Sequence, residues 1–401
     1  MTSTTVVTPK RFRFSSPLAA FASHLRYSLQ DVSFLCGLAG LLFGGVWLWL
    51  PLIVFLFIAH IGTAKFADDL TEPENPPHAL HDFFLRIGLP LMLANGVLLA
   101  YYFTSGDPLH IAAGLRHLGI DLDAARAATS PLDKALGVVV HGFSWGMGQT
   151  AGHELSHRLN SKLDLTLARW IGGLGLDPVF FLHHPFCHHR FLGLMKDPGT
   201  ARRGESLYTF TIRCVIGNTR YAAKAEADRL RRQGRSVFSF HNRFITSWGI
   251  SVLYFVIFLA IGGPVGGLAF IGAGIIARMM LESIAYIEHF GLFRVEGEPL
   301  DHHLSWDVYR TITGATLYNV ARHTDHHLHP LRHCADLKLA PDAPCLPYTY
   351  VTLVMISFIP PIYKRLMKPY LDNWDRTFAT PAELAYMREH NIPHAESIPA
   401  E

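Results

Sequence analysis

The sequence of 401 residues is poor in charge: 17% of its residues are Asp, Glu, Lys or Arg, whereas 50% are hydrophobic. Residues 32–64 contain no charged side chain at all. That run exceeds the roughly 20 residues that one helix needs to cross the hydrocarbon of a bilayer. The length alone would suit two or three soluble domains, but long apolar runs favour a membrane protein.

Cysteine is also scarce. None of the five cysteines forms a C-x-x-C pair, which excludes an iron–sulfur or rubredoxin-type centre within the chain. They are Cys36, Cys187, Cys214, Cys334 and Cys345. The first thirty residues are basic and rich in Ser and Thr, but no short apolar core with a small-residue cleavage site follows. We therefore expect the first span to be a retained anchor.

The apolar stretches predict an all-α membrane protein with about six transmembrane helices in three hairpins. Two stretches have double length and divide at Pro51 and at Gly262-Gly263-Pro264, where Pro and Gly favour a turn. The predicted spans are 32–48, 50–66, 86–105, 134–152, 244–262 and 264–288. Residues 1–29 and 375–401 are predicted as tails of one membrane domain, 30–374.

Basic residues predict the orientation of these spans. Residues 153–244 hold fifteen Lys or Arg against seven Asp or Glu, and the stretch before Asp31 holds only basic charges. Since cytoplasmic loops of membrane proteins carry an excess of Lys and Arg, both segments are expected in the cytoplasm. Six spans also return the C-terminal hundred residues to that side, where they would form a helical cap.

Histidine gathers in three clusters and at one isolated position on this side. Imidazoles spaced by three or four residues fall on one helical face, where their nitrogens can converge on a metal. The nine candidate ligands are His153, His157, His184, His188, His189, His289, His323, His326 and His327. All are placed at the same end of the predicted bundle, which is how bundles build metal sites from distant segments.

Nine nitrogens exceed what one ion takes, because zinc binds about four ligands, so we predict two metals. Imidazole suits iron, zinc, copper and nickel, but chemistry on the C–H bonds of membrane-derived chains requires oxygen activation and favours iron. Metal-bound imidazoles commonly give their other N–H to a carboxylate. The acids predicted for this role are Glu154, Glu282, Glu288 and Asp325, with pairing to Arg278 as the alternative for Glu282.

Other classes of protein share parts of this pattern. His153-Glu154-x-x-His157 matches the zinc-protease motif, in which Glu is the general base, but that reading leaves the other clusters without a purpose. A metal transporter would place its site near the bilayer midplane rather than at one end. The adjacent pairs His188-His189 and His326-His327 do not suit axial ligation of haem.

The order of the clusters, with Tyr286-Ile287-Glu288-His289-Phe290-Gly291 before the last, resembles the bacterial membrane-bound alkane 1-monooxygenases. These belong to the integral-membrane fatty acid desaturase and hydroxylase superfamily. The likeness extends through Asn75-Pro76-Pro77, Asp197-Pro198, Gly204-Glu205-Ser206 and Ser305-Trp306.

The resemblance implies two iron ions held by the nine histidines, with no catalytic residue beyond these ligands. It also implies O2 as co-substrate and hydroxylation of a terminal methyl group, for example of a medium-chain n-alkane to a 1-alkanol. Electrons would come from a rubredoxin or ferredoxin with its NAD(P)H-dependent reductase. The expected location is the bacterial inner membrane, in contact with lipid and not with nucleic acid.

Some positions depart from that family's pattern. His183 stands where Glu is usual, Arg158 where Lys is common, and His302 and His303 are additional. These departures leave the substrate open between an alkane, a methyl group on an aromatic ring, and a fatty acid that is desaturated or decarboxylated. The basic cluster Arg229, Arg231, Arg232 and Arg235 predicts either a docking surface for an acidic electron carrier or a contact with anionic lipid.

Overall fold

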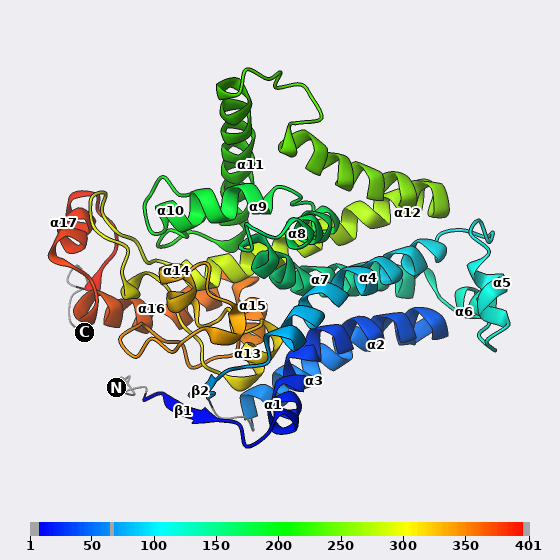
Figure 1. Cartoon of the computed structure of the whole chain (residues 1–401), viewed down its shortest axis with the longest axis horizontal. Helices are drawn as coiled ribbons and strands as arrows, with labels where there is room; N and C mark the ends of the chain where they lie inside the picture. Colours follow the sequence, from blue (N-terminus) through cyan, green and yellow to red (C-terminus); the bar gives the residue numbers. More distant parts are fainter. Residues whose placement is uncertain (1–7, 65–67, 396–401) are drawn as a thin grey trace.

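The computed structural model describes residues 8–64 and 68–395, with side chains omitted for residues 58–64. Parts of the predicted tails and of span 50–66, at 1–7, 65–66 and 396–401, lie outside the described residues. The described chain is predominantly helical (Figure 1). Its one sheet pairs two short parallel strands, β1 (Lys10–Arg13) and β2 (Thr71–Glu74), with Lys10 opposite Thr71.

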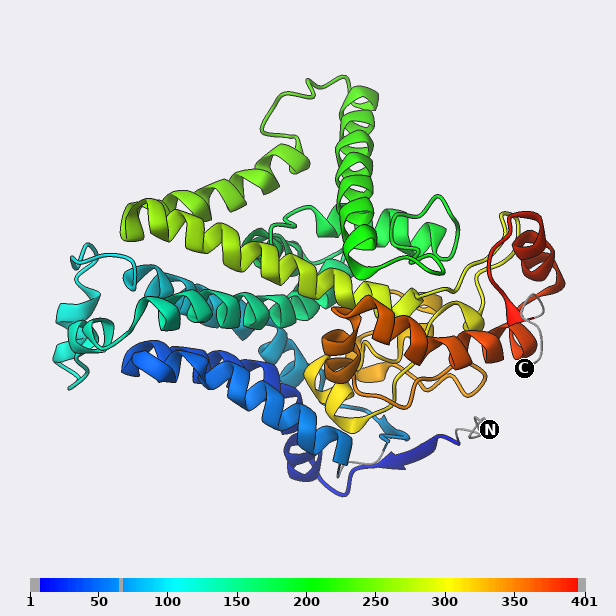
Figure 2. The same cartoon turned by 180° about the vertical axis from the view of Figure 1, so that it is seen from behind.

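A bundle of roughly aligned helices occupies one half of the molecule, and a cap of helices of varied length and loops occupies the other (Figures 1 and 2). The bundle consists of α2 (Leu29–Phe43), α3 (Leu50–Ala64), α4 (His78–Tyr101), α7 (Pro131–Ser156) and α12 (Arg243–His289). Its core includes Trp145, whose ring meets Phe258 edge-on at a centroid distance of 6.0 Å. The two short helices α5 (Ile111–Arg116) and α6 (Leu122–Ala127) close the end away from the cap.

Among the described residues, α4 and α12 are the two helices long and apolar enough to cross a membrane. The backbone of α12 breaks at Gly263, which has φ 64° and precedes Pro264. Beyond the break, a Cβ on Gly266 would lie 2.6 Å from the carbonyl oxygen of Phe258, so the two halves pack against each other. The predicted turn at 262–264 is therefore present.

The first predicted break is misplaced. The chain turns at Gly44, with φ 72°, rather than at Pro51. Pro51 instead lies in the first turn of α3, where its missing N–H costs no helical hydrogen bond. A Cβ on Gly44 would lie 2.4 Å from the carbonyl oxygen of Ala125, so only glycine fits this turn. Helix α4 also begins eight residues before the predicted span, and α7 extends beyond its span at both ends.

The cap contains nine helices within the described residues. They are α8 (Lys162–Leu174), α9 (Phe180–His183), α10 (His189–Phe191), α11 (Leu207–Arg232), α13 (Thr311–Thr316), α14 (His323–Leu328), α15 (Tyr350–Ser357), α16 (Pro360–Thr377) and α17 (Pro381–Glu389). The boundary predicted at residue 374 falls inside α16, and Met387 of α17 is fully buried. In the N-terminal segment, α1 (Pro17–His24) likewise buries His24 against Tyr27 and His81. Both predicted tails are thus partly packed.

Within the cap, a buried ion pair joins α16 to the segment that precedes α11. Arg203 donates to Asp375 through both terminal nitrogens, and the Nη1 to Oδ2 distance is 2.9 Å. Removing one partner of a buried pair leaves an uncompensated charge, which costs about 3–5 kcal/mol. We expect Asp375→Ala to lower the thermal unfolding midpoint markedly in detergent solution. Asp372→Ala removes the partly buried partner of the exposed Lys368 on the same helix and should cost at most about 1 kcal/mol. Equal shifts for the two variants would contradict this assignment.

Candidate metal centre

The first cluster lies at the end of α7 that meets the cap. His153 is in the last turn of the helix and His157 is its C-cap residue, so a spacing of four places both rings on one face. Their ring centroids are 5.0 Å apart. Ser156, between them, turns back and donates to the carbonyl of His153.

The second cluster divides between two directions because the helix widens there. Residues His184–His188 form a π-helical turn between α9 and α10. A π turn repeats after five residues rather than four, so His184 and His189 share a side, with Nε2 atoms 3.1 Å apart. His188 points elsewhere, toward His289 and His327, with ring centroids 4.9 Å from each.

The third cluster divides in the same way. His323 and His327 are one turn apart on α14 and their Nε2 atoms lie 2.9 Å apart. His289, the last residue of α12, brings its Nε2 within 3.1 Å of that of His323. His326 faces the first cluster instead, at ring-centroid distances of 4.7 Å from both His153 and His157.

The nine candidate side chains therefore form two adjoining groups. One contains His153, His157, His184, His189 and His326, and the other His188, His289, His323 and His327. Within each group the potential ligand atoms lie within 4.8 Å of one another, and every ring is buried. The groups meet where the rings of His189 and His327 are 4.3 Å apart.

The unpaired nitrogens fit metal ions. Within the described residues, His153 Nδ1, His157 Nε2 and both nitrogens of His326 are buried without a hydrogen-bond partner. Burial lowers the pKa of His184, His189 and His326 well below the usual value, so these imidazoles are neutral and present lone pairs. Neutral imidazoles whose nitrogens converge are ligand sets that transition metals bind.

Three ring nitrogens on the outer side of the second group are already held. His188 Nδ1 lies 2.9 Å from Oδ2 of Asp197, His289 Nδ1 lies 3.1 Å from the Leu304 carbonyl, and His323 Nδ1 lies 3.2 Å from the Val320 carbonyl. Such bonds fix the tautomer and leave Nε2 free for a metal.

Asp197 was not predicted from the sequence as a partner of the ligands. The signal that could have found it is the turn-forming sequence Asp197-Pro198-Gly199. The structure shows why glycine is needed there, because a Cβ on Gly199 would lie 2.6 Å from Nδ1 of His188. Asp197 also accepts the N–H of Gly199, which fixes this tight turn.

Of the four acids predicted to hold ligand imidazoles, only Glu288 touches one in the structure, and it does so at the ligand nitrogen: its Oε2 lies 3.3 Å from Nε2 of His323, whose Nδ1 is held by the Val320 carbonyl. Glu154 instead accepts the backbone N–H of Cys334, and Asp325 pairs with Arg332. Glu282 pairs with Arg278, the predicted alternative. Glu154, Asp325 and Glu282 differ from the prediction because each carboxylate accepts hydrogen bonds from a donor other than a ligand imidazole.

The additional histidines belong to neither group, and each has its own carboxylate. His183 lies 3.0 Å from Asp177, His303 lies 3.0 Å from Glu383, and His302 pairs with the neighbouring Asp301. His141 is buried in the middle of α7, one residue from Gly142, which packs on α12. A third, partly exposed set of His78, His333 and Asp336 lies on the cap surface.

A narrow cavity lies beside both groups, since His188 lines it together with His153 and His184. Its wall is mostly apolar, with Phe180, Leu281, Ile284 and Ala285 next to His153 and His184. Ring stacking between Phe180 and His184, at 4.5 Å, closes one side. The cavity measures about 50 Å³, so it marks where an apolar group can approach the histidines and is smaller than a whole substrate.

Comparisons with known proteins agree with this geometry. The chain is 29% identical to the xylene/toluene monooxygenase hydroxylase component of Pseudomonas putida over 90% of its length and 92% of that protein. It is 34% identical to the alkane 1-monooxygenase of Ectopseudomonas oleovorans over 57% of its length and 58% of that protein. The alkane 1-monooxygenase 1 of Alcanivorax borkumensis is 33% identical over similar shares.

The family model described as fatty acid desaturase matches residues 131–356, which begin with α7 and include all nine histidines. This range covers more than half of the chain. With the two histidine groups at its centre, the chain belongs to the fatty acid desaturase family.

Proposed function

We propose that this chain is the hydroxylase of a di-iron monooxygenase and oxidises a methyl group of a hydrophobic substrate. The observation that carries the proposal is the pair of histidine groups beside an apolar cavity. Bound iron would supply the activation of O2. The balanced reaction consumes a methyl compound, O2, two electrons and two protons, and yields a primary alcohol and water.

The protein's own residues contribute binding, orientation and dryness. Five histidines would hold one iron and four the other, with His188 oriented by Asp197. Phe180 and Leu281 would position the substrate and keep bulk water from the reacting bond. The two electrons would come from a separate rubredoxin-type or ferredoxin-type carrier, consistent with the absence of a C-x-x-C pair in the sequence.

The topology that we propose has six spans in three hairpins, with the cap and its metals at the cytoplasmic face of a bacterial inner membrane. Helix α12 supports this, because its two apolar halves carry outward-facing side chains such as Val252, Val256 and Leu268. The excess of basic residues between 153 and 244 supports a cytoplasmic cap.

Two substrate classes remain in competition, a methylarene and an n-alkane. The histidine clusters alone resemble those of the alkane 1-monooxygenases and favour an alkane as the substrate. The similarity to the xylene/toluene component, however, covers 90% of this chain, whereas similarity to the alkane enzymes covers 57%. Because the match to the xylene/toluene component extends over nearly the whole chain, we favour an aromatic methyl group as the preferred substrate.

Product analysis tests the proposal. Cells that express the chain with a rubredoxin or ferredoxin system would be fed toluene, n-octane and a fatty acid in competition. We expect benzyl alcohol as the main early product and 1-octanol as a lesser one. Recovery of only desaturated or decarboxylated fatty acid would contradict a hydroxylase, and exclusive 1-octanol would reverse the preference between substrates.

Filling the cavity should block the substrate without disturbing the metals. Ala285 lines the cavity from α12, so Ala285→Phe should lower kcat/KM for toluene by at least about tenfold. The added ring occupies space beside the histidines, and even one methylene too many in an apolar pocket costs about tenfold or more. Iron content should stay unchanged. Ile275→Phe, at an exposed position on the same helix, is the matched control and should leave kcat/KM unaltered. Equal activity of the two variants would place the substrate elsewhere.

A further inference from the structure

The most exposed large hydrophobic side chains of the described residues are Phe238 and Phe240, at 89% and 95% exposure. Both lie in the loop between α11 and α12, and neither takes part in the metal centre. Large exposed aromatic side chains are a common feature of surfaces that contact a partner or a membrane.

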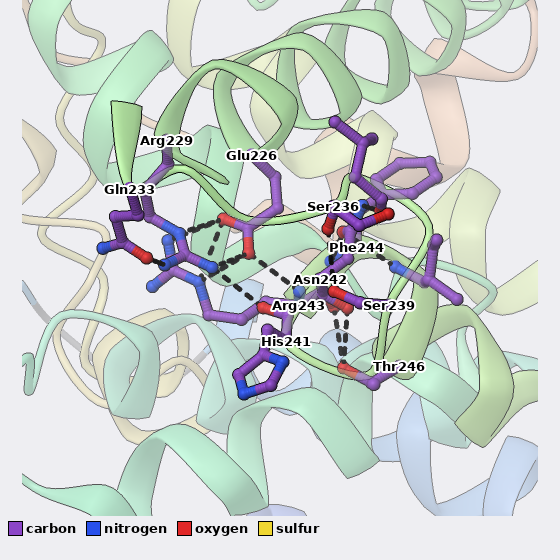
Figure 3. Close-up of polar contacts among 12 residues, drawn as sticks. Glu226, Arg229, Gln233, Ser236, Ser239, His241, Asn242, Arg243, Phe244 and Thr246 are labelled. Atoms are coloured by element: carbon purple, nitrogen blue, oxygen red, sulfur yellow. Dashed lines mark hydrogen bonds and ion pairs between the residues drawn. The ribbon is translucent and has the colours of Figure 1, made fainter. Parts of the chain in front are cut away.

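The loop is held in a defined shape by one buried carboxylate. Glu226, near the end of α11, accepts hydrogen bonds from Arg229 at 2.9 Å and from the side chain and backbone N–H of Arg243, the latter at 2.8 Å (Figure 3). Burial alone would raise the pKa of Glu226, but these hydrogen bonds outweigh it and lower the pKa to about 2. The carboxylate therefore stays ionised at any working pH and ties the two ends of the loop together.

Further bonds fix the middle of the loop. Asn242 donates to the Val237 carbonyl at 2.8 Å and caps α12 through the N–H of Phe244. Ser239, between the two phenylalanines, donates to the Ser236 carbonyl at 2.8 Å (Figure 3). The two aromatic side chains are thus presented outward by a braced loop.

The backbone of the loop lies on the side of α11 that faces the bundle (Figures 1 and 2). Helix α11 runs across the direction of α4, α7 and α12, and the loop after it lies on the bundle side of α11 in both views (Figures 1 and 2). If the bundle crosses a membrane, α11 runs along the membrane surface and the loop faces the lipid. The apolar surface continues from there into α12, whose Ile245, Val252 and Val256 are exposed.

The charge of this segment is complementary to anionic lipid. Residues 207–243 hold eight Lys or Arg against two acids, and both acids are already paired, Glu226 as described and Asp228 with Lys224 and Arg231. Among the described residues, Arg220, Arg232 and Arg235 contact no carboxylate, so their charge is free for an external anion. Of the basic cluster predicted from the sequence, Arg229 and Arg231 instead form ion pairs with Glu226 and Asp228 of the same segment.

We propose that residues 220–242 form an interfacial arm that rests on an anionic lipid surface, with Phe238 and Phe240 inserted among the lipid chains. Basic residues beside inserted aromatic side chains are the pattern by which proteins bind the membrane interface. The inference rests on the proposed membrane topology and does not depend on the reaction.

An electron carrier fits this surface less well, for a reason of distance. Cys214 and Asn218 of α11 line the cavity beside the metals, whereas the loop follows Arg232. At 1.5 Å per residue, Cys214 and Arg232 are about 27 Å apart along the helix. A carrier bound at the loop would be far from the metals that it must reduce.

The test reports the surroundings of the loop in nanodiscs that contain anionic phospholipid. In a full-length background with Cys36 and Cys345 changed to Ser, an environment-sensitive fluorophore would be attached at Phe238→Cys. Val252→Cys, on the exposed face of α12, is the lipid-facing control, and Glu389→Cys, exposed on α17, is the water-facing control. Quenching by lipid-attached nitroxide is compared with quenching by a water-soluble agent.

We expect the label at Phe238→Cys to be quenched from lipid, like that at Val252→Cys, while the label at Glu389→Cys is quenched from water. Arg232→Gln with Arg235→Gln should reduce lipid quenching at Phe238→Cys in anionic but not in zwitterionic nanodiscs, since each basic residue near such a surface is worth about fivefold in the local equilibrium.

Quenching of the Phe238→Cys label from water, with the Val252→Cys label in lipid, would overturn the arm and leave the membrane topology in place. Protection of the Phe238→Cys label from the water-soluble quencher only when a redox carrier is added would identify a protein partner. Protection that rises with protein concentration in detergent would identify a second copy of the chain. Either result would also overturn the arm. Water access at Val252→Cys would overturn the topology and the arm together.

Discussion

Replacing His326 with glutamine should reduce hydroxylation to the level of the metal-free protein and should remove iron from the first histidine group. His326 is the only member of that group that comes from α14, and its ring lies 4.7 Å from those of both His153 and His157. Its loss leaves four of the five nitrogens and opens the side of the group that faces the second one. Iron per chain, measured by elemental analysis, should fall together with product formation.

The control for this variant is His303→Gln. His303 is also a buried histidine of the cap, but it is paired with Glu383 and lies in neither group. It should retain iron and turnover, although its stability is expected to fall. Full turnover by His326→Gln with an unchanged iron content would contradict the assignment of the first group.

The second large effect is expected from Asp197→Asn. The carboxylate of Asp197 lies 2.9 Å from Nδ1 of His188 and is fully buried, so it fixes the tautomer and the orientation of that ring. Loss of such a partner typically costs about 10–100-fold in metal affinity or activity. The variant should lose iron from the second group faster than the wild type when a chelator is added.

Glu383→Gln is the matched comparison, because it neutralises an equally buried carboxylate beside a histidine that lies outside the metal groups. Its iron should dissociate at the wild-type rate. If the two variants release iron equally slowly, Asp197 has a role in packing alone.

The sequence was sufficient to predict which histidines come together, because the ligand type and its spacing are local properties. It could not predict how they divide. The π-helical turn at His184–His188 places His188 and its neighbour His189 in different groups. No known residue pattern predicts a π turn. Likewise, His326 and His327 are adjacent in sequence and belong to different groups.

The acids were harder to predict, because their partners are decided by tertiary contacts. Glu154 adjoins His153 but is satisfied by the N–H of Cys334, 180 positions later in the chain. Asp197 has no histidine beside it in sequence and reaches His188 only through a tight turn at Gly199. Proximity in sequence to a ligand is therefore a poor guide to contact with its ring.

The breaks in the apolar stretches show the same limit. The turn at Gly263 was predicted because Gly262-Gly263-Pro264 concentrates three turn-forming residues. In the first stretch the turn was predicted at Pro51, but the chain turns at Gly44. The backbone of Ala125 approaches Gly44 so closely that no side chain fits there. Such an approach is visible only once the helices are packed.

Metal analysis of the purified wild-type protein, combined with Mössbauer spectroscopy of iron-57-enriched samples, tests the central claim most directly. The two histidine groups predict two iron ions per chain, each bound by nitrogen ligands. One zinc ion per chain, bound near His153 and His157 with no iron at the other group, would contradict the account.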